Sequence, residues 1–135
     1  MAILDRDAEI RHILETDDTA IYFTQREKER DKQTRGWNIA YWQWRGNLDN
    51  NTDAFEVFEL PHGSLGIKDE MKEFVDALRE AGIERIIVTD SSTALMRSLH
   101  ELIATGCTIE GPATVTRKSR WSDDDIRLGL EVRLA

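Results

Sequence analysis

The sequence predicts an α+β domain centred on a helix–strand–helix unit between Ile67 and Gly106. Apolar residues recur at three- and four-residue steps before Gly82, a spacing that indicates an amphipathic helix. The apolar run 86–88 then suits a strand buried on both faces, because β-branched side chains fit a pleated sheet. A second apolar set at helical spacing, ending at Gly106, predicts another helix. Strand-like segments on both sides of this unit complete the α+β pattern.

Three strand-like segments precede the central unit. Aromatic and β-branched residues dominate the first, and apolar side chains alternate with others in the second and third. The predicted strands cover Ala20–Thr24, Trp37–Arg45 and Ala54–Leu60. A short helix is also predicted over Asp5–Glu15, within an N-terminal extension of residues 1–18. The segment Arg26–Gly36 reads as a loop in which basic and acidic residues alternate.

The chain after Gly106 predicts a strand over Thr108–Lys118, in which Pro112 indicates an edge position or a bulge. The last segment allows two interpretations. Apolar residues alternate strictly from Ile126 to Leu134, as in a strand, yet Ser122 followed by three aspartates is a strong helix start. The residue pattern alone leaves both open.

Length and composition describe one soluble globular domain. The chain has 135 residues, of which 40% are hydrophobic and 33% charged. No apolar run approaches the roughly 20 residues that span a bilayer, and the N-terminus lacks the pattern of a secretory signal. Cys107 is the only cysteine, which excludes an internal disulfide and fits a reducing compartment. We therefore expect a cytoplasmic protein with no membrane partner.

The net charge of −8 argues against a broad basic surface that binds nucleic acid non-specifically. It leaves open a local basic patch, and it leaves open a site whose carboxylates hold divalent metal ions. An acidic surface also fits a small inhibitor protein that mimics nucleic acid, or one whose charge only aids solubility.

Element order and local motifs together resemble type 1 ribonuclease H. In that family the first central helix opens with a catalytic glutamate, followed seven and eight residues later by a small residue and leucine; here Glu70 is followed by Ala77 and Leu78. The family's next strand ends in Asp-Ser, which corresponds to Asp90 and Ser91. The stretch 36–46 is also similar to the family's glycine–aromatic and aromatic–Arg–Gly motifs. The resemblance covers residues 20 to 106.

This resemblance implies a ribonuclease H-like fold, with a mixed sheet of at least five strands that begins with three antiparallel ones. It favours the helical interpretation of the last segment, starting at Ser122. It also implies Mg²⁺ or Mn²⁺ held by converging carboxylates, which would activate water for phosphodiester hydrolysis. The implied catalytic and metal-binding residues are Glu70, Asp90 and Asp125. Gln25 stands in place of the family's first aspartate, and an amide lacks the bridging charge, so the implied site is weakened.

Two functions follow as expectations. One is metal-dependent cleavage of an RNA–DNA hybrid or another nucleic acid. The other is a domain without catalysis that binds nucleic acid or a protein partner. In either case basic side chains would contact phosphates and tryptophans would stack on bases, although solvated charges and packed tryptophans explain the same residues. The residues expected to contact nucleic acid are Arg26, Lys28, Arg30, Ser91, Trp42 and Trp44.

Overall fold

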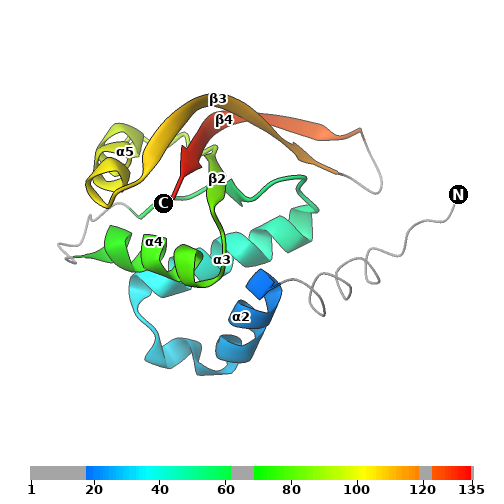
Figure 1. The fold of residues 1–135 in the computed structure, drawn as a ribbon. Coiled ribbons are helices and arrows are strands. Elements are labelled where there is room, and N and C mark those ends of the chain that lie inside the picture. Colours follow the sequence, from blue (N-terminus) through cyan, green and yellow to red (C-terminus); the bar gives the residue numbers. More distant parts are fainter. Residues whose placement is uncertain (1–17, 62–68, 119–122, 135) are drawn as a thin grey trace, which may run out of the picture.

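Helical elements come first in the described chain, and a long β-hairpin ends it (Figure 1). The computed structural model describes residues 18–61, 69–118 and 123–134. These residues form an α+β fold with one mixed sheet, so the α+β class and the mixed sheet are confirmed. The sheet of the described residues has four strands, whereas at least five were expected. The elements are α2 (Asp18–Arg26), η1 (Glu27–Lys32), α3 (Arg35–Asn50), β1 (Glu56–Val57), α4 (Glu70–Glu80), β2 (Arg85–Val88), α5 (Leu95–Ala104), β3 (Thr108–Arg117) and β4 (Asp125–Arg133).

The predicted helix–strand–helix unit is present as α4, β2 and α5. One side of α4 is buried because Met71, Phe74 and Leu78 recur at helical spacing. Gly82 follows this helix with a φ of +85°, a left-handed conformation that glycine adopts without steric cost. The last three residues of β2 are buried, as expected for a strand covered on both faces.

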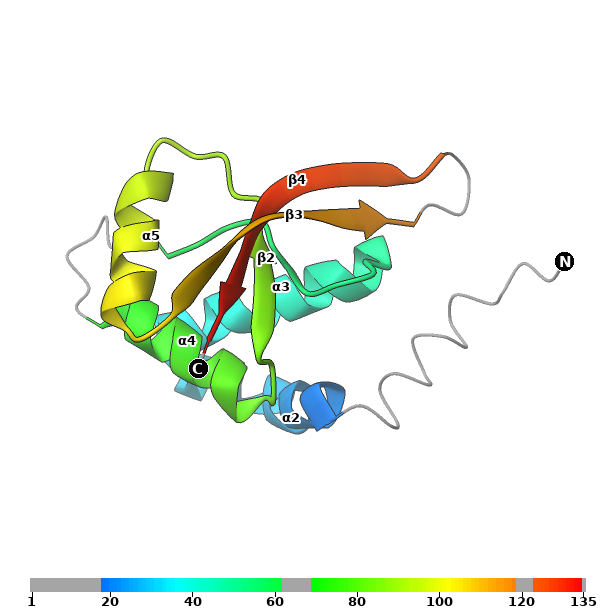
Figure 2. The same cartoon turned by 45° about the horizontal axis from the view of Figure 1, so that its top comes forward.

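The sheet has the strand order β1-β2-β4-β3. Figure 2 shows β2 together with the long hairpin that β3 and β4 form. β1 runs parallel to β2 and connects to it through α4, whereas β4 is antiparallel to both β2 and β3. The predicted strand over Thr108–Lys118 is therefore confirmed as β3, at one edge of the sheet. Its register shifts between Ile109 and Gly111, directly before Pro112, so the missing proline N–H disrupts an edge ladder and not a central one.

The helices form a second layer. α3 and α4 lie together beneath the sheet, α2 packs against them, and α5 lies beside β3 (Figure 1). Thr19 donates a hydrogen bond to the carbonyl of Ala81, and Trp37 Nε1 donates one to the Tyr22 hydroxyl, which joins α2 to its neighbours. Within the described ranges, no helix is long and apolar enough to cross a membrane.

Two predicted strands are helices, and those predictions were wrong. Ala20–Thr24 lies in α2 and Trp37–Arg45 lies in α3. The Thr34 side chain caps α3 by accepting a hydrogen bond from the N–H of residue 37 at 3.2 Å. Aromatic residues favour strands in isolation, but here they recur at helical spacing and fill one buried face. The largest members of that face are Trp37, Tyr41, Trp44 and Leu48.

The third predicted strand, Ala54–Leu60, forms only in part. It is reduced to the two residues of β1, which pair parallel to β2. Because the two preceding segments are helical, the three antiparallel strands implied by the ribonuclease H resemblance are not present in residues 18–61. The predicted N-terminal helix, Asp5–Glu15, lies outside the described residues.

The helix predicted from Ser122 is wrong over Asp125–Arg133, which is the strand β4. Strict alternation decides the structure, because it places Val132 opposite Ile86 of β2, where both side chains are fully buried. A helix would turn these apolar residues to all sides and leave β2 without a partner on that edge. Ser122 itself lies outside the described residues.

Candidate nucleic-acid interface

Glu70 and Asp90, two of the three predicted metal ligands, are buried and hold structural contacts. Glu70 begins α4, and its Oε2 lies 3.5 Å from Nε of Arg35 at the start of α3. Asp90 follows β2 and accepts hydrogen bonds from the backbone N–H groups of Leu60, at 2.9 Å, and Ser92, at 2.7 Å. Each carboxylate therefore connects two segments of the fold.

Asp125, the third predicted ligand, is exposed at the start of β4, where it lies 3.5 Å from Arg127 of the same strand. Gln25 is exposed on α2. In the part of the chain that the structure describes, no three His, Cys, Asp or Glu side chains are grouped so that they could hold a metal ion. The fold therefore does not bring Glu70, Asp90 and Asp125 together as one site.

A buried ion pair that no sequence pattern indicated joins Glu56 of β1 to Arg117 at the end of β3. Arg117 donates from Nε and Nη2 to the two oxygens of Glu56, each at 2.8 Å, and the Thr89 hydroxyl donates to the same carboxylate. Burial raises the pKa of Glu56, but the hydrogen bonds from Arg117 and Thr89 outweigh it, so the pKa lies below its ordinary value of 4.5. The pair closes the distal end of the hairpin onto β1.

We expect the Glu56 ion pair to contribute stability at neutral pH that is lost in acid. Because the pKa of Glu56 is lower in the folded protein than in the unfolded chain, the unfolded chain binds the proton first as the pH falls. Protonation therefore favours unfolding below the ordinary pKa of 4.5. Urea denaturation from about pH 7 to about pH 3 measures this, with Glu56→Gln as the non-titrating control. An equally steep loss of stability in the control would contradict the assignment.

The segment 26–45 carries a local positive charge. It contains six Arg or Lys residues and three carboxylates, a net charge of +3 in a chain whose total is −8. Two hydrogen bonds hold η1 against α3: Asn38 Nδ2 donates to the carbonyl of Arg30 at 3.1 Å, and the Tyr41 hydroxyl donates to Glu27 at 3.3 Å. Burial, followed by the charge of Glu27, raises the pKa of Tyr41, which keeps that hydroxyl a donor.

Trp42 is the exposed aromatic residue of this segment. Its side chain is 55% exposed, whereas Trp37, Tyr41 and Trp44 are buried. The guanidinium carbon of Arg30 lies 5.4 Å from the Trp42 ring centre and 5.3 Å from that of Tyr41. Trp44 stacks on Phe23 inside the helix layer and therefore serves packing, not ligand contact.

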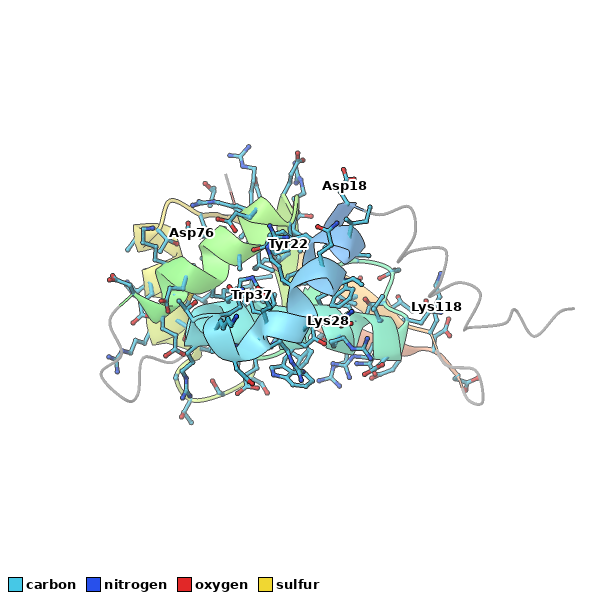
Figure 3. The ribbon with its side chains drawn as sticks, turned by 90° about the horizontal axis from the view of Figure 1, so that it is seen from below. Asp18, Tyr22, Lys28, Trp37, Asp76 and Lys118 are labelled. Carbon is cyan, nitrogen blue, oxygen red and sulfur yellow. The ribbon has the colours of Figure 1, made fainter. Side chains whose placement is uncertain are left out.

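Of the other predicted contact residues, Arg26 is engaged within its own helix, Ser91 lies in a different loop, and Lys28 is exposed in η1. Arg26 lies over the Tyr22 ring, 4.0 Å from its centre, and donates to the Tyr22 carbonyl, so it is engaged within α2. Ser91 is exposed in the loop that leads from β2 to α5. Lys28 is exposed on the helical face of the molecule, away from the sheet (Figure 3).

Four side chains therefore form the candidate interface, and we call it the η1–α3 surface. Its three cations are Lys28, Arg30 and Arg45, and among the described residues no carboxylate lies within 4.0 Å of any of them. Arg45 lies one turn beyond Trp42 on α3. It was not selected from the sequence, because the segment was predicted to be a strand. The surface consists of Lys28, Arg30, Trp42 and Arg45.

In a comparison with protein families, the model of DUF7698, a domain of unknown function, matches residues 39–129. The matched span runs from α3 to β4, so it includes Trp42 and Arg45 and begins after η1. No curated protein and no solved structure matched the chain.

Proposed function

This chain belongs to the DUF7698 family, a domain of unknown function, and we propose that it binds nucleic acid without cleaving it, through the η1–α3 surface. The observation that carries the proposal is the exposed Trp42 ring with the Arg30 guanidinium 5.4 Å from its centre. Aromatic rings stack on bases, and guanidinium groups contact phosphates or add cation–π attraction. Lys28, Arg30 and Arg45 have no carboxylate within 4.0 Å among the described residues, which supports attraction to phosphates at this surface despite the acidic total.

Hydrolysis is the second candidate, as the resemblance to ribonuclease H implies. Glu70 at the start of α4 and Asp90 after β2 are both buried carboxylates, the type of side chain that holds metal ions in a two-metal nuclease. Their present partners are a guanidinium and backbone N–H groups, and Asp125 is not grouped with them. The contacts of these acids therefore support a binding function better than Mg²⁺- or Mn²⁺-dependent cleavage.

Removing one cation from the surface is expected to weaken binding and its salt dependence. Arg30→Ala should reduce the slope of log affinity against log salt by about 1, because one phosphate contact is lost. Fluorescence anisotropy with labelled oligonucleotides, at several salt concentrations, measures both effects. The control is Arg97→Ala on α5, which also removes one positive charge, from an exposed arginine paired with Glu101. It should change neither the affinity nor its salt dependence.

Three outcomes would overturn the proposal. Binding that does not depend on salt, or the absence of binding, would point to a protein partner instead. An Arg97→Ala effect as large as that of Arg30→Ala would show that only total charge matters. Cleavage of an RNA–DNA hybrid with Mg²⁺ or Mn²⁺, lost in Asp90→Asn, would favour the nuclease.

A further inference from the structure

We infer that the ligand of the η1–α3 surface is a single strand, with one unpaired base stacked on Trp42. The inference rests on the proposed function and specifies the form of nucleic acid. Three observations support it: the exposure of the Trp42 ring, the position of Arg30 beside that ring, and the side chains that α3 exposes to solvent.

Trp42 differs from the aromatic residues around it. Phe23, Trp37, Tyr41 and Trp44 pack against one another with ring centres 5.2 to 6.2 Å apart, and all are buried. Trp42 touches that cluster only at the edge, where its ring meets Tyr41 in a T-shaped contact at 5.3 Å. More than half of its side chain is left in water, so a flat apolar partner could still cover a large area.

Arg30 is held where it can complete such a contact. Its carbonyl accepts hydrogen bonds from the N–H of Gln33, at 3.0 Å, and from Asn38 Nδ2, at 3.1 Å, which fix the end of η1 against α3. The guanidinium is then positioned near both the Tyr41 and Trp42 rings, with no carboxylate within 4.0 Å among the described residues. The exposed ring could stack on a base while the guanidinium beside it contacts the phosphate of the same nucleotide.

The outward face of α3 is poorly suited to a duplex. A helix that reads the major groove presents side chains that hydrogen-bond to base edges. Here the exposed ring of Trp42 lies midway along the helix, and it has one N–H donor and a bulky face. Further along, the exposed carboxylate of Asp49 would meet phosphates of a long double helix. In a duplex each base face is already stacked, whereas a single strand offers free faces, which is why stacking platforms select it.

Anisotropy with labelled dT, rU and duplex oligonucleotides of about 15 nucleotides tests the inference on the full chain. The single strands should bind at least about tenfold more tightly than the duplex. Trp42→Ala should weaken single-strand binding about 5- to 150-fold, the range expected for one stacked base. Trp42→Phe should restore part of the loss, because it keeps an aromatic face. Leu128→Ala is the matched control, since it removes another exposed apolar side chain, from strand β4 and not from the η1–α3 surface.

The outcomes separate this inference from the proposed function. Duplex binding as tight as single-strand binding, still weakened by Arg30→Ala, would overturn the inference and keep the function. Unchanged single-strand binding in Trp42→Ala would also overturn it. No binding to any of the oligonucleotides would overturn both. Thermal unfolding of each variant checks that the fold is retained, which an exposed substitution should allow.

Discussion

Arg117→Ala is expected to lower the free energy of unfolding by about 3–5 kcal/mol, the largest effect of any substitution proposed for this protein. The change removes both hydrogen bonds from Arg117 to the carboxylate of Glu56, which is only 1% exposed. The hydrogen bond from the Thr89 hydroxyl to that carboxylate is kept. A buried charge without its counter-ion costs far more than a lost surface contact. Urea denaturation at neutral pH measures the difference.

The matched control for Arg117→Ala is a double variant that removes both charges. Glu56→Leu with Arg117→Met replaces the pair by apolar side chains of similar volume, and it should recover much of the lost stability. A double variant no more stable than Arg117→Ala would show that packing, and not the stranded charge, causes the loss. Circular dichroism should show the same fold in both variants.

Gly36→Ala is expected to destabilise the protein by about 1–3 kcal/mol, although the same change usually stabilises a helix by about 0.5–1 kcal/mol. Gly36 lies in the first turn of α3, where α3 crosses α4. An added Cβ would lie 2.5 Å from Cβ of Glu73 and 2.8 Å from the backbone nitrogen of Phe74, and it would also meet the carbonyl of Glu70. Backbone atoms of a packed helix cannot move aside, so the two helices would have to separate.

Gly46→Ala is the control on the same helix. Its Cβ would also be crowded, at 2.5 Å, but by the outer edge of the Phe58 ring, which can rotate away. We therefore expect a smaller loss of stability than for Gly36→Ala, offset in part by the gain in helix propensity. Chemical denaturation of both variants checks this order. The reverse order, or a stabilising Gly36→Ala, would contradict the proposed close approach of α3 and α4.

The segments predicted correctly are those in which one pattern acts alone. In α4 the apolar residues fit a helix and no other element, and the β-branched run of β2 fits only a strand. The errors came where two patterns coexist. Trp37–Arg45 is rich in aromatic residues, which favour strands, but the spacing of these residues also fits a helix. The segment is helical because that spacing lets one face pack against α4. The last segment begins with a helix-start pattern, Ser122 followed by three aspartates, yet Asp125–Arg133 is a strand because its alternating apolar residues let β4 pair with β2.

For the candidate site, the sequence indicated the chemistry of the residues, and the fold showed their exposure and partners. Basic residues and Trp42 could be selected from the sequence as possible contacts, because their chemistry suits phosphates and bases. Whether a tryptophan faces water depends on its neighbours in space: Trp42 is exposed, whereas Trp44, two residues later, is buried. Likewise Glu70 and Asp90 had the residue types of metal ligands, but their partners became known only from the fold.

By itself the sequence determined the α+β class, the central α4–β2–α5 unit, and that the strand with Pro112 lies at an edge or contains a bulge. Each of these follows from local periodicity or backbone chemistry. Tertiary structure alone decided that 20–24 and 37–45 are helical, that Glu56 pairs with Arg117, and that Trp42 stays exposed beside Arg30. Those features depend on contacts between residues far apart in the chain or on different faces of one helix. Such contacts form when apolar surface is buried, and no single stretch of sequence contains them.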